Sequence, residues 1–402
     1  MYRKRSSSSR QVLRGTSIPE PAGNDLRTQR LQSFHTPFRR HVTDIARRAS
    51  CFSDLAETFP GLLFALATGY GTVEARRSAA THVAGGAPLR EAADALGLPW
   101  WTRKLPPQAF TQRLANLPQE AAFATRIVNL LPQAPGLSGK WLERVLQAYR
   151  SCHAEFALWV AKHDRFHSPL VADPALPYLA AWAWYSEHPE TMGGRLLRRK
   201  WQPSMSPNRA FDELTIWRKR LRLALSLSSL EREPWLISGA ARGYEIVELR
   251  TVDDFIAESA AMDNCLDAFA EKLEANVCYV FSIRENGVPV ADLEIGAHPH
   301  EPKLPSIVQL RGPRNRRASP HVWRAAYAWL GNQPLRPAPP LLIDAPKRRR
   351  AWRDLWKPYV SGLESDDRST FEQLAIGLDR LKPSRSRSRA RPAVRAPRTA
   401  ET

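Results

Sequence analysis

A thiol, a carboxylate and two imidazoles stand close together in the sequence between residues 265 and 300. Cys265 supplies the thiol, Glu294 the carboxylate, and His298 and His300 the imidazoles. A cysteine becomes a nucleophile when a nearby base takes its proton, and a carboxylate can orient that base. This combination predicts a thiol-dependent enzyme in which Cys265 attacks, a histidine is the base and Glu294 orients it. The alternative for the histidines is a solvated loop, because their stretch AHPHEPKLP is rich in proline and charge.

The environment of Cys265 depends on where the preceding helix ends. Asn264 is a good helix N-cap, and Asp267 three residues later completes a weak capping box. This pattern predicts that Cys265 lies in the first turn of a new helix, where unpaired amide groups favour a thiolate. In the alternative, one helix runs unbroken from DDFIAESAA through Cys265, which is then a small buried hydrophobic residue.

A second set of polar side chains suits binding rather than catalysis. Arg311 and Arg284 can contact an anion, while Gln309 and Asn315 can form amide hydrogen bonds. Asn264 is a further candidate binding residue. In the alternative, these groups only hold the strands together, since buried polar networks often serve rigidity alone. The expected cleft gathers Cys265, Glu294, Gln309, Arg311 and Asn315, with Arg284 at its edge.

A β-hairpin must position several of these groups. Asn286-Gly287 suits a two-residue turn, and it is flanked by VCYVFSIR and VPVADLEI. A third run, from Ser306 to Arg311, adds Gln309 and Arg311 at the same period of two. Arg284 falls on the other face, and a one-residue slip of the register would exchange the faces. With this turn, the pairs on one face are Ile283 with Val290, Phe281 with Asp292, and Tyr279 with Glu294.

The motifs of this region taken together, N-C-L, F-S-I-R, D-L-E-I and V-Q-L-R-G-P-R-N, resemble those of the PcfJ-like family of conjugative plasmids and bacterial chromosomes. The resemblance covers about residues 235–335. It implies an accessory role in mobile-element biology without an established reaction. Phe269 stands where many relatives have tyrosine, and Asn264 where many have histidine. The family motif matches Asn264, Cys265, Arg284, Glu294, Gln309, Arg311, Gly312 and Asn315.

Length and composition bound the remaining classes. The 402 residues and 43% hydrophobic content allow two or three domains with sizeable cores. Four scattered cysteines without a C-x-x-C pair predict neither a zinc site nor a disulfide framework, and a reducing cytoplasm fits best. We expect no metal, no cofactor and no membrane partner, because no glycine-rich phosphate loop and no long apolar run occurs.

The net charge of +19 is concentrated at the two ends of the chain. Residues 1–40 carry +7 and residues 381–402 carry +6, in stretches rich in serine, proline and arginine. Such compositions bury too little apolar surface to fold, so both ends are predicted to be disordered. Basic arms of this kind either bind nucleic acid weakly and without specificity or only keep the chain soluble.

Residues 41–230 are predicted to be helical. Ser206-Pro207 starts a helix whose apolar face includes Leu214 and Trp217. The segment PLREAADALGLPWWTRKLP at residues 88–107 resembles a helix-turn-helix, with Gly97 ending the first helix and Arg103 in the second. Because prolines shorten the second helix, an ordinary packing corner is the favoured interpretation. Tryptophans 100, 101, 182 and 184 are expected in the core rather than as platforms for bases.

The predicted fold class is α+β: a mostly helical region followed by a small domain with an antiparallel hairpin or three-stranded sheet. The expected function is a binding or accessory protein with an unknown protein partner. The alternatives are the thiol-dependent enzyme and a DNA-binding regulator that uses residues 88–107 and the arms. The expected divisions are a basic arm (1–40), a helical region (41–230), the PcfJ-like domain (235–335), a helical segment in two short pieces around Pro358 (336–380) and a basic tail (381–402).

Overall fold

A computed structural model describes residues 23–167, 175–231, 233–274, 279–298, 300–301, 303–339 and 342–363. The chain divides into two compact units, which are treated separately below. The first unit comprises residues 1–146 and 160–171, and the second comprises 147–159 and 172–402. The division falls inside the helical region expected for residues 41–230. The predicted basic tail, residues 381–402, lies outside the described residues.

The first unit is made of helices, because its apolar residues recur at the helical period. Its core centres on α4, where PGLLFALAT is almost entirely buried and Phe64 stacks between Phe34 and Phe110. Part of the arm expected to be disordered is helical, since α1 and α2 begin before residue 40. Its helices before residue 130 are α1 (Gly23–Gln32), α2 (Thr36–Ala46), α3 (Ser50–Thr58), α4 (Pro60–Thr68), α5 (Val73–Ala84), α6 (Leu89–Leu96) and α7 (Ala121–Ile127).

Of the helix-turn-helix considered as the alternative for residues 88–107, only the first helix forms. Helix α6 ends at Gly97, which takes the left-handed conformation (φ 66°) that suits glycine. A five-residue 3-10 helix, Trp100–Lys104, then replaces the recognition helix. Its Arg103 donates to the carbonyl of Thr58 at 3.2 Å and lies over the ring of Trp100. The packing-corner interpretation is therefore confirmed for this segment.

Helices α8 (Ser138–Ser151) and α9 (Ala154–Lys162) follow, and the division between the units runs through both. The second unit continues with further helices, several of which start as the sequence predicts. Ser206 caps α12 with Pro207 at its first position, and Leu214 and Trp217 are buried. One helix, α16, runs through Pro358, so the prediction of two short pieces was wrong. The helices are α10 (Leu176–Glu187), α11 (Met192–Arg195), α12 (Pro207–Ser229), α13 (Val252–Met262), α14 (Ala270–Glu274), α15 (Pro320–Gly331) and α16 (Ala345–Gly362).

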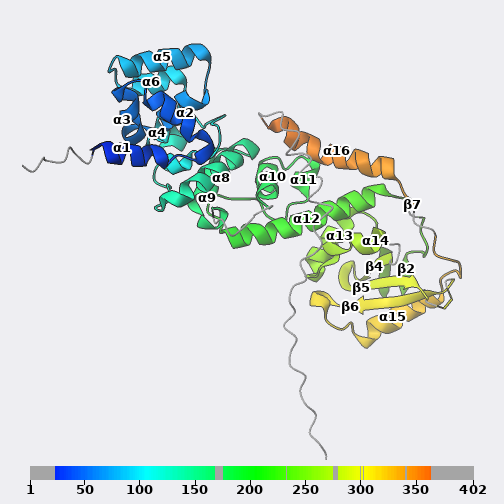
Figure 1. The fold of residues 1–402 in the computed structure, drawn as a ribbon. Coiled ribbons are helices and arrows are strands. Elements are labelled where there is room, and N and C mark those ends of the chain that lie inside the picture. The colour runs from blue at the N-terminus through cyan, green and yellow to red at the C-terminus, as the bar shows by residue number, and fades with distance from the viewer. Residues whose placement is uncertain are drawn as a thin grey trace, which may run out of the picture. The chain divides into compact units, whose positions relative to one another are not determined.

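A five-stranded antiparallel sheet with strand order β2-β3-β4-β5-β6 forms the rest of the second unit (Figure 1). The α+β class is thus confirmed, with a wider sheet than the predicted hairpin and third strand. Separately, β1 (Leu230–Glu231) pairs with β7 (Leu342–Ile343). The five strands are β2 (Gly239–Ala241), β3 (Tyr244–Glu248), β4 (Tyr279–Glu285), β5 (Val288–Ala297) and β6 (Pro305–Arg311).

The register of the hairpin differs from the predicted one by one residue. The turn lies at Asn286-Gly287 as expected, and Arg284 pairs with Pro289. The register then shifts, so that Ile283 pairs with Ala291 and Val290 is left as an extra residue, a β-bulge. The predicted pairs were therefore wrong, and so was the opposite face for Arg284. The actual pairs beside the two acids are Ser282 with Asp292 and Val280 with Glu294.

The bulge determines which side chains of β4 and β5 share a face of the sheet, and therefore which helices pack on them. Tyr279, Phe281 and Leu293 lie in the apolar cluster that includes Trp329 of α15. Ser319 caps α15, and its inward residues are the four predicted, Val322, Ala325, Ala326 and Trp329. The other face carries Val280, which packs with residues of α12, α13 and α14. Asp292 and Glu294 share this second face with Val280.

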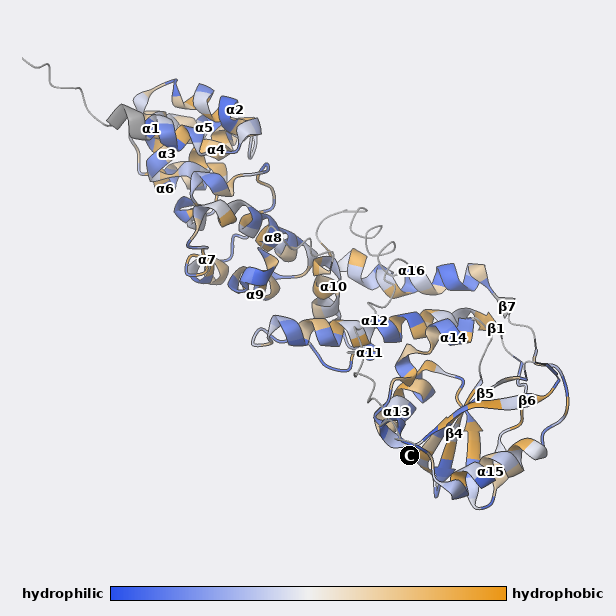
Figure 2. Cartoon of the chain, turned by 60° about the horizontal axis from the view of Figure 1, so that its bottom comes forward, coloured by the Kyte–Doolittle hydropathy of each residue, from blue (hydrophilic) through white to orange (hydrophobic). Residues whose placement is uncertain are grey.

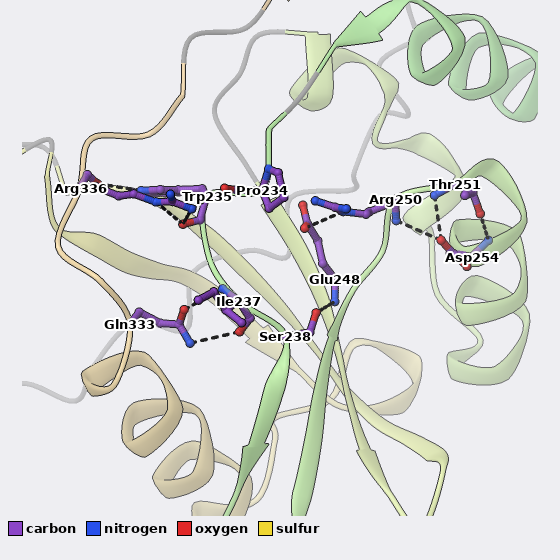
Figure 3. Close-up of polar contacts among 10 residues, drawn as sticks. All are labelled: Pro234, Trp235, Ile237, Ser238, Glu248, Arg250, Thr251, Asp254, Gln333 and Arg336. Carbon is purple, nitrogen blue, oxygen red and sulfur yellow. Dashed lines mark hydrogen bonds and ion pairs between the residues drawn. The ribbon is translucent and has the colours of Figure 1, made fainter.

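The segment that enters the sheet is tied to the segment that leaves α15 (Figure 3). Arg336 donates to the carbonyls of Pro234 and Trp235, and the Trp235 indole donates to the carbonyl of Arg336 at 2.8 Å. Gln333 accepts from the amide of Ile237 at 2.8 Å and donates to its carbonyl at 3.2 Å. These contacts fix the start of β2 against the end of α15.

Tryptophans 101, 182 and 184 are buried, in agreement with their expected core role. Within the described part of the chain, no helix is both long and apolar enough to cross a membrane.

Candidate functional site

One pocket, with a volume of about 300 Å³, lies on the second face of the sheet. Its walls come from the segment after α13, from α14, from β4, β5 and β6, and from the turn after β6. Six residues singled out in the sequence line it together: Asn264, Cys265, Glu294, Gln309, Arg311 and Asn315. The remaining lining residues are Leu266, Phe269, Lys272, Val280 and Asp292.

The loop that carries Cys265 begins where α13 stops. Asp263 adopts the left-handed conformation (φ 49°), which ends the helix one residue after Met262. The Oδ1 of Asn264 then accepts from the amide of Leu266 at 3.1 Å, which turns the chain into the 3-10 helix Leu266–Ala268. Cys265 stands just before this helix and is exposed. Both predicted environments for Cys265, the first turn of an α-helix and a buried position, were therefore wrong.

A buried ion pair anchors this loop to α12. The Nε of Arg220 lies 3.7 Å from the Oδ2 of Asp267, and the two side chains are only 9% and 10% exposed. Arg220 also donates to the carbonyl of Leu196 at 3.4 Å. Asp267 follows Cys265 by two residues. This contact therefore holds the loop that carries the Cys265 thiol against α12.

Asp292 forms the floor of the pocket and is almost completely buried. The side-chain amide of Asn264 donates to its Oδ2. Burial, together with the adjacent carboxylate of Glu258, raises the pKa of Asp292 to about 8. The Oδ1 of Asp292 and the Oε1 of Glu258 are both buried without a conventional donor. This raised pKa favours a protonated Asp292 at neutral pH, and its proton can satisfy the buried oxygens.

Arg284 balances the charge of Glu258. Its guanidinium lies 3.7 Å from Glu258 Oε2, and its Nε donates to Ser282 Oγ at 3.0 Å. It shares the face of the sheet with Asp292 but does not line the pocket. Arg284 therefore lies outside the pocket lining, rather than at its edge as predicted.

Glu294 is held by a lysine and not by a histidine. The Nζ of Lys272 in α14 lies 2.9 and 2.8 Å from the two carboxylate oxygens of Glu294. Lys272 also lies over the ring of Phe269, 4.7 Å from its centroid. Glu294 is 6% exposed and Lys272 is 46% exposed, so the ion pair closes one wall of the pocket.

His298 and His300 do not line the pocket. They follow β5 in a separate loop, where their rings are 5.9 Å apart and the amide of His300 faces Nδ1 of His298 at 3.4 Å. The predicted arrangement of Cys265, a histidine and Glu294 is therefore not formed in this structure. The prediction failed because closeness in sequence does not mean closeness in space. Both histidines come after the end of β5, the strand that carries Glu294.

Strand β6 supplies two side chains to the pocket, Gln309 and Arg311. Gln309 pairs with Glu294, and Arg311 pairs with Asp292, which places both side chains on the pocket face as predicted. Asn315 reaches the pocket from a turn in which it and Arg314 have positive φ (57° and 56°). Arg314 pairs with Asp263 at 3.1 Å. Among the described residues, the guanidinium of Arg311 has no hydrogen bond or ion pair.

Sequence reasoning missed three groups of the site: Lys272, Asp292 and Glu258. Asp292 could have been found, because it alternates with Glu294 on one strand face. Lys272 and Glu258 reach the pocket region only through the packing of α14 and α13 on the sheet. No sequence spacing predicts this packing.

The comparisons with known proteins add no relative to this picture. No protein family, no curated protein and no solved structure matches the chain. The resemblance to the PcfJ-like family is therefore a prediction from the sequence motifs alone.

Proposed function

We propose that the sheet domain of this chain is a binding module whose pocket takes an anionic group of a partner protein. The charge balance of the pocket supports this. In the pocket, Glu294 is compensated by Lys272, and the raised pKa of Asp292 favours its neutral form; next to the pocket, Asp263 is compensated by Arg314. Arg311 is left as the positive charge without a protein counterion among the residues described here.

The observation that carries the proposal is the position of Arg311 beside Gln309 and Asn315 in one pocket. A guanidinium presents a planar fork of donors that matches carboxylate or phosphate oxygens, and the two amides can complete the set. The volume of about 300 Å³ suits a small group rather than a whole helix. Leu266, Phe269 and Val280 form an apolar wall for the carbon atoms of such a group.

The resemblance to PcfJ-like proteins extends the proposal to biology. We place the chain among accessory proteins of plasmids or other mobile elements, where the pocket serves recognition and not catalysis. In this role Cys265 is a wall of the pocket, and its exposed thiol is not required for binding.

The test compares small anions on the purified full-length chain. Glutarate and inorganic phosphate are titrated calorimetrically into the wild type, an Arg311→Gln variant and an Arg316→Gln variant. Arg316 is exposed, lies outside the pocket and carries the same charge, so it is the matched control. We expect Arg311→Gln to weaken binding by about tenfold or more and Arg316→Gln by much less. Equal affinities in the wild type and Arg311→Gln would show that the pocket does not bind anions.

A further inference from the structure

Helix α16 carries a row of basic side chains that the pocket does not use. Its eighteen residues include six lysines and arginines and one acid, Asp354. Two of the six are engaged within the protein: Lys347 lies 3.6 Å from Asp344, and Arg348 lies 3.0 Å from Glu274. The other four are exposed and form no ion pair within the described ranges: Arg349, Arg350, Arg353 and Lys357.

These four residues, called the α16 stripe below, share one face of the helix. At 100° per residue they fall within an arc of about 100°, which borders the buried side of the helix because Arg349 lies about 20° from Trp356. Arg349, Arg353 and Lys357 follow one another at intervals of four, so the stripe is about 12 Å long. One strand of a B-form duplex presents about three or four phosphates over that length. The number and spacing of the cations therefore match those of a nucleic acid backbone.

The adjoining face of α16 is fixed in the protein. Leu355, Trp356 and Tyr359 are fully buried. The Tyr185 hydroxyl donates to the carbonyl of Leu355, and Tyr359 donates to the carbonyl of Ser151 at 2.7 Å. Figure 2 shows hydrophilic residues over much of α16, on a helix that lies along α12. The stripe is thus presented on a rigid support.

This burial decides between two kinds of anionic surface. A basic helix that binds a membrane inserts its apolar face between the lipids. The apolar face of α16 is occupied by Tyr185 and Trp217, whose rings pack against Trp356 at centroid distances of 6.0 and 6.1 Å. Only the charged side is free to meet a partner, which favours a hydrated polyanion over a lipid bilayer.

We propose that the α16 stripe binds the phosphate backbone of a nucleic acid. Contacts of this kind depend on charge and not on base sequence, and they release counterions from the nucleic acid. The stripe is an ordered element, distinct from the basic ends of the chain and from the pocket at Arg311.

The test measures binding of the full-length chain to a short fluorescent DNA duplex of random sequence at several salt concentrations. The four stripe residues are replaced by glutamine in one variant. In the matched control, four exposed arginines of the first unit are replaced, which removes the same charge: Arg40, Arg48, Arg77 and Arg113. Circular dichroism and melting temperature confirm that both variants fold.

We expect the stripe variant to bind about tenfold more weakly at moderate salt and to lose about three to four from the slope of log affinity against log salt. The control variant should keep nearly the wild-type slope. A third variant with lysine at 349, 350 and 353 should retain binding, because the charge is kept.

Two results would overturn the proposal. An equal loss in the stripe and control variants would mean that only net charge matters, and no loss in either would assign binding to other parts of the chain. Vesicles with anionic lipids are measured in parallel. A stripe variant that loses vesicle binding while its DNA binding is unchanged would identify the surface as a membrane site instead.

Discussion

Lys272 and Glu294 form a two-point contact across the pocket, with the lysine Nζ 2.9 and 2.8 Å from the carboxylate oxygens. The lysine comes from the five-residue helix α14 and the glutamate from the middle of β5. Glu294 is nearly buried, and Lys272 is its ion-pair partner. The contact therefore joins the helical wall of the pocket to its sheet.

Replacing Lys272 by methionine should lower the free energy of unfolding by about 1–3 kcal/mol, because a buried carboxylate loses its counterion. Urea unfolding measures the change. Arg314→Met is the control, because Arg314 and Asp263 form an ion pair that is 68% and 75% exposed. That pair should contribute less than about 0.5 kcal/mol. Equal losses of unfolding free energy in the two variants would contradict a stabilising role for the Lys272–Glu294 ion pair.

The raised pKa of Asp292 predicts a pH dependence with a definite sign. The pKa of Asp292 is about 8 in the folded chain and about 4 when unfolded, so the folded state holds the extra proton between these values. Stability from this group is therefore present at acidic pH and is lost as pH rises toward about 8.

Asp292→Asn should flatten the dependence of unfolding free energy on pH between about pH 5 and pH 8, because asparagine cannot ionise. Urea titrations at several pH values measure the slope. Asp263→Asn, at an exposed carboxylate, should leave the slope of the wild type. A slope that survives in Asp292→Asn would mean that another group holds the proton.

The exposure of Cys265 predicts selective alkylation. Iodoacetamide should modify Cys265 at least about tenfold faster than Cys152, since burial raises the pKa of the Cys152 thiol well above its usual value. Peptide mass spectrometry after short exposures gives both rates, and Cys265→Ser identifies the peptide. Equal modification rates for Cys265 and Cys152 would show that the loop at 263–269 shields the Cys265 thiol.

The Arg220–Asp267 pair predicts a test of how the Cys265 loop is held. Arg220→Ala should cost about 3–5 kcal/mol, because Asp267 remains charged and buried. The double variant Arg220→Met, Asp267→Leu should recover most of that loss, since it buries apolar groups of similar size. Thermal and urea unfolding compare the two. A double variant as unstable as the single one would mean that packing, and not charge, dominates there.

The elements with local signals were predictable. The Ser-Pro pairs at 206 and 319 start α12 and α15, and Asn286-Gly287 makes the hairpin turn. The shared face of Glu294, Gln309 and Arg311 also followed from the period of two along the strands, whereas the approach of Cys265 to them depends on the packing of the helices.

What failed depended on single residues whose effect is not local. The extra residue Val290 reverses the faces of the strands beyond it, and a bulge leaves little mark in an apolar sequence. Asp263 ends α13 in a conformation that non-glycine residues rarely adopt. Lys272 displaced the expected histidine because tertiary packing, not sequence distance, chose the partner of Glu294.

The short pairing of β1 with β7 has a topological consequence. Leu230, at the end of α12, lies opposite Ile343, just ahead of α16, so the chain leaves and rejoins the helical part at one place. The sheet domain is in effect an insertion into a helical pair, with its entry and exit strands side by side. A short linker from Glu231 to Leu342 could therefore replace the insert and separate the α16 stripe from the Arg311 pocket, once Arg220 and Leu223 of α12, which lose their partners in the insert, are also replaced.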